Sequence, residues 1–129
     1  MTSEYQMLVW SVILGLVQLV IAVVAAIKVR GLAWAFSPRD KVMPPLEGMA
    51  GRIDRAFSNF LETFPLFAAL VLTAGALGVH GPMTQWGTML YFWARVVYVP
   101  IYVLGLPVVR TGVWTVSAVG MVMLVLALL

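Results

Sequence analysis

Four long apolar runs, separated by polar or turn-forming segments, dominate the sequence. The first covers residues 8–27 without a single charge, and at about 1.5 Å per helical residue it can cross a hydrocarbon core about 30 Å thick. A polar loop at about 29–52 follows it, and tight turns around His80 and Gly105 separate the later runs. The pattern predicts helices at about 7–28, 53–79, 84–105 and 112–129. We therefore expect one membrane domain over residues 1–129, an all-α bundle of four transmembrane helices.

The composition supports a membrane environment. Of the 129 residues, 63% are hydrophobic and only 10% are charged, whereas soluble domains are about half apolar and a quarter charged. A soluble domain of this size buries only about two-thirds of its surface, so it could not hide this many apolar side chains. The first apolar run is too long for a signal peptide, and no Lys or Arg precedes it. We expect it to be a retained helix.

The basic residues predict an orientation. Six of the eight lie between Lys28 and Arg55, and Arg110 lies in the last short turn, whereas the turn at His80 has no basic residue. Because cytoplasmic loops are enriched in Lys and Arg, we expect the long loop to be cytoplasmic and the two termini to face outward. The compact chain, without a retention signal, favours a bacterial inner membrane.

Several classes of site are disfavoured by the residues themselves. The chain has no cysteine, which excludes disulfides, thiolate metal sites and cysteine nucleophiles. It has no metal-ligand cluster and no nucleotide-binding loop. The basic loop belongs to a membrane protein and not to a separate basic domain, so no nucleic-acid partner is expected. A small four-helix exporter is disfavoured because residues 8–27 lack the carboxylate that such proteins carry in their first helix.

The second predicted helix carries the first candidate site residues. Arg52, Arg55, Asn59 and Glu62 follow one another at i, i+3, i+7 and i+10, which predicts a single stripe. The helical rise puts Glu62 about 10 Å deeper than Arg55. An ionised carboxylate at that depth is costly in lipid, so we expect Glu62 to point into the bundle, paired or hydrated.

The third predicted helix carries a matching row. Its members, at i, i+4, i+7 and i+11, are Tyr91, Arg95, Tyr98 and Tyr102. Arg95 should lie near the depth of Glu62, with Arg110 in the loop just below. The two rows predict a pocket with surplus positive charge, suited to an anionic ligand because guanidinium groups bind carboxylates bidentately. The alternative is that Glu62 and Arg95 neutralise each other and only fix the register of the helices.

Two motifs carry a resemblance to a known family. The first, Arg-Ala-x-x-Asn-x-x-Glu-x-x-Pro, is matched by Arg55, Ala56, Asn59, Glu62 and Pro65. The second, Ala-Arg-x-x-Tyr-x-x-x-Tyr, is matched by Ala94, Arg95, Tyr98 and Tyr102, and Arg110 fits a later arginine. In these motifs the chain resembles the membrane-associated proteins in eicosanoid and glutathione metabolism (MAPEG). That family includes the microsomal glutathione transferases, leukotriene-C synthase, microsomal prostaglandin E synthase and the lipoxygenase-activating protein.

The resemblance implies a homotrimer that binds glutathione, as co-substrate, between neighbouring subunits near the cytoplasmic side. Arg110 is the candidate catalytic residue, because a cation near a thiol favours the thiolate. The candidate glutathione-binding residues are Arg52, Arg55, Asn59, Glu62, Arg95, Tyr98 and Tyr102.

The implied activity is that of a glutathione-dependent membrane transferase or peroxidase. Its thiolate would attack a small lipophilic electrophile or hydroperoxide that enters from the membrane lipids. The alternative is a non-catalytic member that binds a thiol or a lipid, since Thr63 and Phe57 replace residues common in the enzymes, namely Tyr and either Gln or His. The residues do not distinguish glutathione from another low-molecular-weight thiol.

Overall fold

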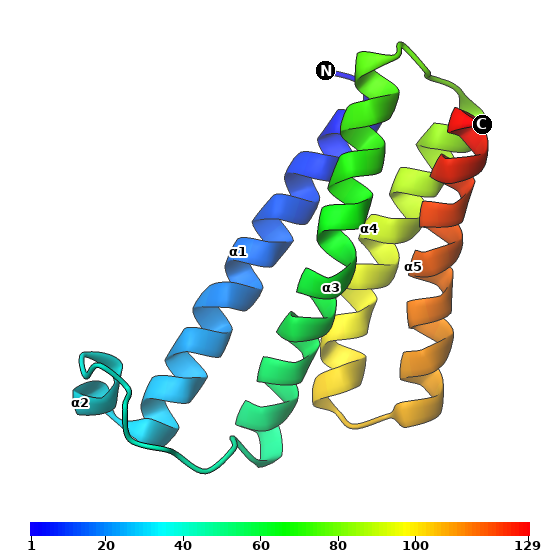
Figure 1. The fold of residues 1–129 in the computed structure, drawn as a ribbon. Helices are drawn as coiled ribbons and strands as arrows, with labels where there is room; N and C mark the ends of the chain where they lie inside the picture. Colours follow the sequence, from blue (N-terminus) through cyan, green and yellow to red (C-terminus); the bar gives the residue numbers. More distant parts are fainter.

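The computed structural model describes residues 1–129, and every regular element in it is a helix. The helices are α1 (Ser3–Arg30), α2 (Leu32–Ala35), α3 (Gly48–Ala76), α4 (Pro82–Val103) and α5 (Pro107–Leu128). Figure 1 shows the four long helices side by side in alternating directions. Both termini and the α3–α4 turn lie at one end of the bundle, here called the terminal end. The segment with α2 and the α4–α5 turn lie at the other, the loop end. The all-α prediction is confirmed.

Apolar side chains cover the outside of the bundle, as a lipid solvent requires. Three helices, α1, α3 and α5, are long and apolar enough to cross a membrane. In α1 the buried residues are all polar (Glu4, Ser11 and Gln18), while most of its large apolar side chains face outward. Tyr5 and Leu8 are partly buried and pack against the core. The helix α4 is as long as α5, with 22 residues each, but its Thr, Gln, Tyr and Arg side chains make it less apolar. The fourth span therefore stays a prediction.

The helices begin earlier than the sequence pattern suggested. The helix α3 starts at Gly48 and not near 53, α5 starts at Pro107 and not near 112, and the short α2 forms within the long loop. Proline is favoured in the first turn of a helix, because it lacks only an N–H that would have no partner there. As a result Arg110 is not a loop residue. It lies in the first turn of α5, where its N–H donates to the carbonyl of Leu106 at 2.9 Å.

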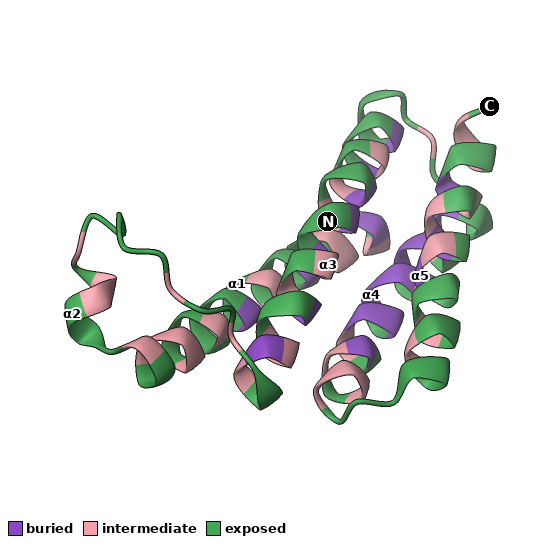
Figure 2. Cartoon of the chain, turned by 60° about the horizontal axis from the view of Figure 1, so that its bottom comes forward, coloured by how far each residue is buried: buried purple, intermediate pink, exposed green.

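The core lies between α3, α4 and α5. The buried positions of α3 recur at helical spacing: Gly51, Ala56, Phe60, Thr63, Phe67, Val71 and Ala74. The Phe67 and Tyr91 rings stack with centroids 3.9 Å apart, and the Tyr91 hydroxyl shares a hydrogen bond of 2.9 Å with Thr63. Figure 2 shows the buried residues gathered on the facing sides of the helices. Tyr91 is thus a core residue, although it begins the row that also holds Arg95.

A carboxylate joins α1 to the start of α4 at the terminal end. Glu4 is only 5% exposed. One of its oxygens accepts a hydrogen bond from the Thr84 hydroxyl at 2.9 Å, and the other lies 2.9 Å from Nδ1 of His80. A buried carboxylate is tolerated when it is paired and hydrogen-bonded in this way. The His80 side chain is half exposed and pairs with Glu4, so it also holds the turn between α3 and α4.

Two glycines allow α4 and α5 to approach each other closely. A Cβ on Gly120 would lie 2.5 Å from the carbonyl oxygen of Gly87, and a Cβ on Gly87 would lie 2.8 Å from that of Gly120. Small residues at such crossings are typical of helix pairs in membranes, where packing replaces the hydrophobic effect as the main attraction.

We predict that Gly120→Ala lowers the free energy of unfolding by about 1–3 kcal/mol, because overpacking forces two backbones apart. The measurement is reversible unfolding in mixed detergent micelles. The matched control is Gly112→Ala in the same helix, where nothing lies within 4 Å of the added methyl group. That control should be neutral or stabilising by about 0.5–1 kcal/mol, as expected for Gly to Ala within a helix. Equal free energies of unfolding for the two variants would contradict the close approach of α4 and α5.

Candidate functional site

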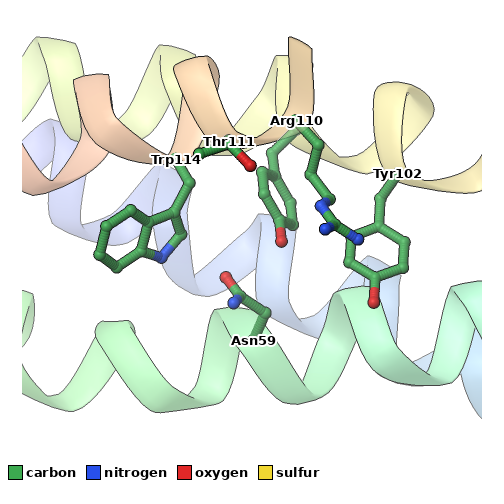
Figure 3. A pocket seen from close by; sticks show the side chains of 6 residues that line it. Asn59, Tyr102, Arg110, Thr111 and Trp114 are labelled. Atoms are coloured by element: carbon green, nitrogen blue, oxygen red, sulfur yellow. The ribbon is translucent and has the colours of Figure 1, made fainter. Parts of the chain in front are cut away.

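A cavity of about 310 Å³ opens between α3, α4 and α5 in the half of the bundle nearer the loop end. Six residues line it: Asn59, Tyr98, Tyr102, Arg110, Thr111 and Trp114. Figure 3 shows Asn59 reaching from α3 towards side chains of the other two helices, with Arg110 beside Tyr102 and Trp114 on the opposite side. The structure therefore brings together four of the eight predicted site residues.

Aromatic rings position the arginine of the cavity. Tyr98 and Tyr102 lie one helical turn apart, with ring centroids separated by 5.6 Å. The guanidinium carbon of Arg110 lies 5.0 Å from the centroid of the Tyr102 ring, a distance typical of a cation–π contact. No carboxylate lines the cavity. The positive charge of Arg110 is therefore not neutralised by any group of its own site.

A second guanidinium lies directly behind this cavity. Arg95 is 1% exposed, and its Nη1 donates a hydrogen bond of 2.9 Å to Oδ1 of Asn59. Its guanidinium carbon lies 4.2 Å from the ring centroid of Tyr98. The Nε and Nη2 groups have no hydrogen-bond partner, and no carboxylate forms an ion pair with the side chain. A buried charge without a counter-ion is costly, so this part of the bundle favours an incoming anion.

Glu62 does not point into the bundle as expected. Its side chain is exposed, and it does not form the ion pair with Arg95 that was considered above. It instead borders an apolar groove of about 700 Å³ between α3 and α5, which shares Asn59 and Trp114 with the cavity. The reason is the register of α3. Its buried stripe runs through Phe60 and Thr63, which leaves Glu62 on the flank.

The two arginines at the start of α3 also lie outside the cavity. Nη1 of Arg52 donates to the carbonyl of Val103 at 3.1 Å, so this side chain caps the C-terminal end of α4. Arg55 is exposed, and its guanidinium lies beside Gly51, one turn back along the helix. The predicted stripe is therefore split, because Arg52 and Asn59 are half-buried whereas Arg55 and Glu62 are exposed.

Sequence reasoning missed Thr111 and Trp114. Both line the cavity from the first two turns of α5, and the Thr111 hydroxyl donates to the carbonyl of Pro107 at 3.1 Å. The signal that could have identified them is Pro107, which begins α5. With α5 beginning there, Arg110 and Trp114 fall at i and i+4 on one face. With the helix assumed to begin at 112, the face could not be recognised.

The donor set fits an organic anion better than a metal ion. No group of three or more His, Cys, Asp or Glu side chains could hold a metal. The cavity instead offers a guanidinium, two phenol hydroxyls and an amide. These groups can donate hydrogen bonds to carboxylate or thiolate groups.

Comparison with known families agrees with the two motifs. The model of the MAPEG family matches residues 7–129, nearly the whole chain, including the two motifs and Arg110. The chain belongs to the MAPEG family. Together with its apolar helices, this makes it a membrane protein with a function connected to glutathione or eicosanoids. No curated protein matches the sequence.

We predict that Asn59→Ala lowers the free energy of unfolding of this MAPEG protein by about 1.5–3 kcal/mol, the usual contribution of a hydrogen bond to a charged group. The substitution removes the one hydrogen-bond partner of Arg95. The change in the free energy of unfolding is measured by reversible unfolding in mixed detergent micelles. Ser58→Ala, at the exposed neighbouring position, is the control and should change stability by less than about 0.5 kcal/mol. If Asn59→Ala were as stable as the control, Arg95 would have to rely on another partner.

Proposed function

We propose that this MAPEG protein is a glutathione-dependent membrane transferase or peroxidase that acts on lipophilic electrophiles. The observation that carries the proposal is the charge of the cavity. Arg110 lines it, Arg95 lies buried behind Asn59, and neither forms a salt bridge with a carboxylate. Glutathione carries two carboxylates and a thiol that becomes anionic when it reacts, so it fits a positive cavity.

In the proposed reaction Arg110 stabilises the thiolate of glutathione. A free thiol has a pKa of about 8.5, and a neighbouring cation lowers it, which raises the thiolate fraction near neutral pH. The thiol proton leaves to solvent. The thiolate sulfur then forms a bond to the electrophilic carbon of the second substrate while the bond to its leaving group breaks. Asn59, Tyr98 and Tyr102 hold the tripeptide by hydrogen bonds.

The apolar groove between α3 and α5 supports a lipophilic second substrate. Eight of its eleven lining residues are hydrophobic, and it adjoins the cavity at Asn59 and Trp114. A substrate dissolved in the bilayer could therefore reach the thiolate without crossing water. Holding both reactants at one junction would also supply the proximity that accelerates bimolecular reactions.

The assembly we propose is a homotrimer with four membrane spans per subunit, α4 being the fourth. Arg55 and Glu62 support a site shared between subunits, because both are exposed on a single chain and outside its cavity. A neighbouring copy would bring them to glutathione, with Glu62 facing its ammonium group.

The loop end holds nearly all the basic side chains, so we place it in the cytoplasm, with the protein in a bacterial inner membrane.

The second candidate is a non-catalytic MAPEG protein that binds a lipid. The observation that favours it is the size of the apolar groove, about 700 Å³ against about 310 Å³ for the polar cavity. Lipid binding without turnover of any electrophile would support this alternative.

We predict that Arg110→Ala lowers kcat/KM for conjugation of glutathione to a chlorinated dinitrobenzene by about 10- to 100-fold, the equivalent of losing one charge-assisted hydrogen bond. The deficit should shrink as the pH rises towards the pKa of the free thiol, because solution then supplies the thiolate. Val109→Ala, whose side chain is exposed in the same turn, is the control. A deficit that stays constant with pH would contradict thiolate stabilisation.

We predict that Arg55→Ala weakens glutathione binding, measured by calorimetry on the detergent-purified protein, without changing the oligomeric state seen in sedimentation. A charge-assisted contact to a carboxylate contributes about 1.5–3 kcal/mol, so the Kd should rise about 10- to 100-fold. Wild-type binding is the reference. If the wild type failed to bind glutathione at millimolar concentration, the transferase proposal would fall and the ligand would have to be sought among lipids or other thiols.

A further inference from the structure

The segment that joins α1 to α3 has no role in the proposed glutathione site. Together with the last turn of α1 it comprises residues 28–47, and this stretch is called here the interfacial loop. Figure 1 shows it beside the loop end of α1, and Figure 2 shows α2 reaching away from the rest of the bundle. The helix α2 packs against α1 and against no other helix. This segment therefore needs an explanation outside the bundle.

Several large apolar side chains of the interfacial loop are exposed, because no other part of the chain packs over them. Leu32 is 62% exposed, Phe36 is 87% exposed and Val42 is 92% exposed. Water is a poor solvent for all three. They lie at the end of a helix that is apolar and long enough to cross the membrane, so the edge of the bilayer is close to them.

Basic side chains are interspersed with these apolar ones. The loop holds four, Lys28, Arg30, Arg39 and Lys41, against two acidic residues, Asp40 and Glu47. None of the four forms an ion pair within the chain, and Lys28, Arg39 and Lys41 are exposed. The loop thus offers free positive charge beside exposed apolar groups.

A tryptophan keeps the loop ordered. The guanidinium carbons of Arg30 and Arg39 lie 4.9 and 4.5 Å from the centroid of Trp34. Arg30 also donates to the carbonyl of Pro44 at 3.0 Å, which ties the end of α1 to the far arm of the loop. Arg39 has a φ of 62°, uncommon for a residue with a side chain, and its N–H donates to the Ser37 hydroxyl at 3.2 Å. The basic and apolar groups are therefore presented by a defined conformation.

We propose that the interfacial loop binds the anionic phospholipid headgroups of the adjacent leaflet, with Phe36 and Val42 inserted beneath the headgroups. Basic and aromatic residues together are typical of segments that lie in a membrane interface. Clusters of Lys and Arg next to a membrane span attract anionic lipids, and Trp prefers headgroup depth. A small soluble anion would leave Phe36 and Val42 exposed, and a neutral leaflet would leave the cations without partners. The inference needs only that α1 spans the membrane and is independent of glutathione.

The absence of cysteine makes a direct test possible. Full-length Phe36→Cys and Val42→Cys proteins are labelled with an environment-sensitive fluorophore and placed in phosphatidylcholine nanodiscs, with or without phosphatidylglycerol. We expect spin-labelled lipid to quench the label more strongly, and aqueous iodide to quench it less, when phosphatidylglycerol is present. Met83→Cys, an exposed apolar position in the first turn of α4 at the terminal end, is the matched control and should not respond.

Charge removal provides the second arm of the test. In the labelled protein, the double substitution Lys28→Gln and Lys41→Gln leaves the contacts of Trp34 intact. The ratio of lipid-inserted to water-exposed label should fall about fivefold for each basic residue removed. Equal quenching in neutral and anionic nanodiscs would overturn the proposal, and so would full access of iodide in both. Protection from both iodide and spin-labelled lipid would also overturn it, and would show that a second copy of the chain covers the loop instead.

Discussion

The arrangement of the site depends on one buried cation. Arg95 lies in the packed part of the bundle and has a single hydrogen-bond partner, Asn59, with Tyr98 alongside. This hydrogen bond orients the amide of Asn59 at the boundary between the core and the cavity. It therefore determines which polar atom of the amide can contact a ligand. A core made only of apolar side chains would avoid the free-energy cost of burying this charge. The buried cation therefore supports the proposal that this site binds an anion.

The rest of the bundle supports that cation with few polar contacts and several close approaches. In α1 the buried side chains are polar and most of the large apolar ones face outward, because lipid solvates the latter better than the bundle does. Gly87 and Gly120 bring α4 against α5, which places Arg110 on α5 near Tyr102 on α4. Glu4 joins α1 to α4 at the opposite end. In lipid, close packing and hydrogen bonds thus hold the helices together, whereas in water hydrophobic burial would do so.

The sequence predicted the four long helices because their apolar runs are long and interrupted by clear turn signals. It predicted Asn59, Tyr98, Tyr102 and Arg110 as neighbours through their spacing and the family motifs. It could not predict the direction of Glu62, because helical spacing identifies a shared face but not which neighbouring helix covers it. It misplaced Arg110 because Pro107 was taken as a turn residue, although proline also suits a helix start. Thr111 and Trp114 were missed for the same reason.

The charge of the cavity and the polarity of its surroundings together constrain the proposed chemistry. Arg95 and Arg110 act in a region of low dielectric constant, where their field on a bound group is stronger than it would be in water. The groove beyond Asn59 and Trp114 is mostly apolar, with the carboxylate Glu62 at its border, so it favours lipophilic molecules over anions. An anion is therefore stable on one side of Asn59 and a neutral lipophile on the other. The two meet only at that junction, where a thiolate would lose its hydration without losing its counter-charge.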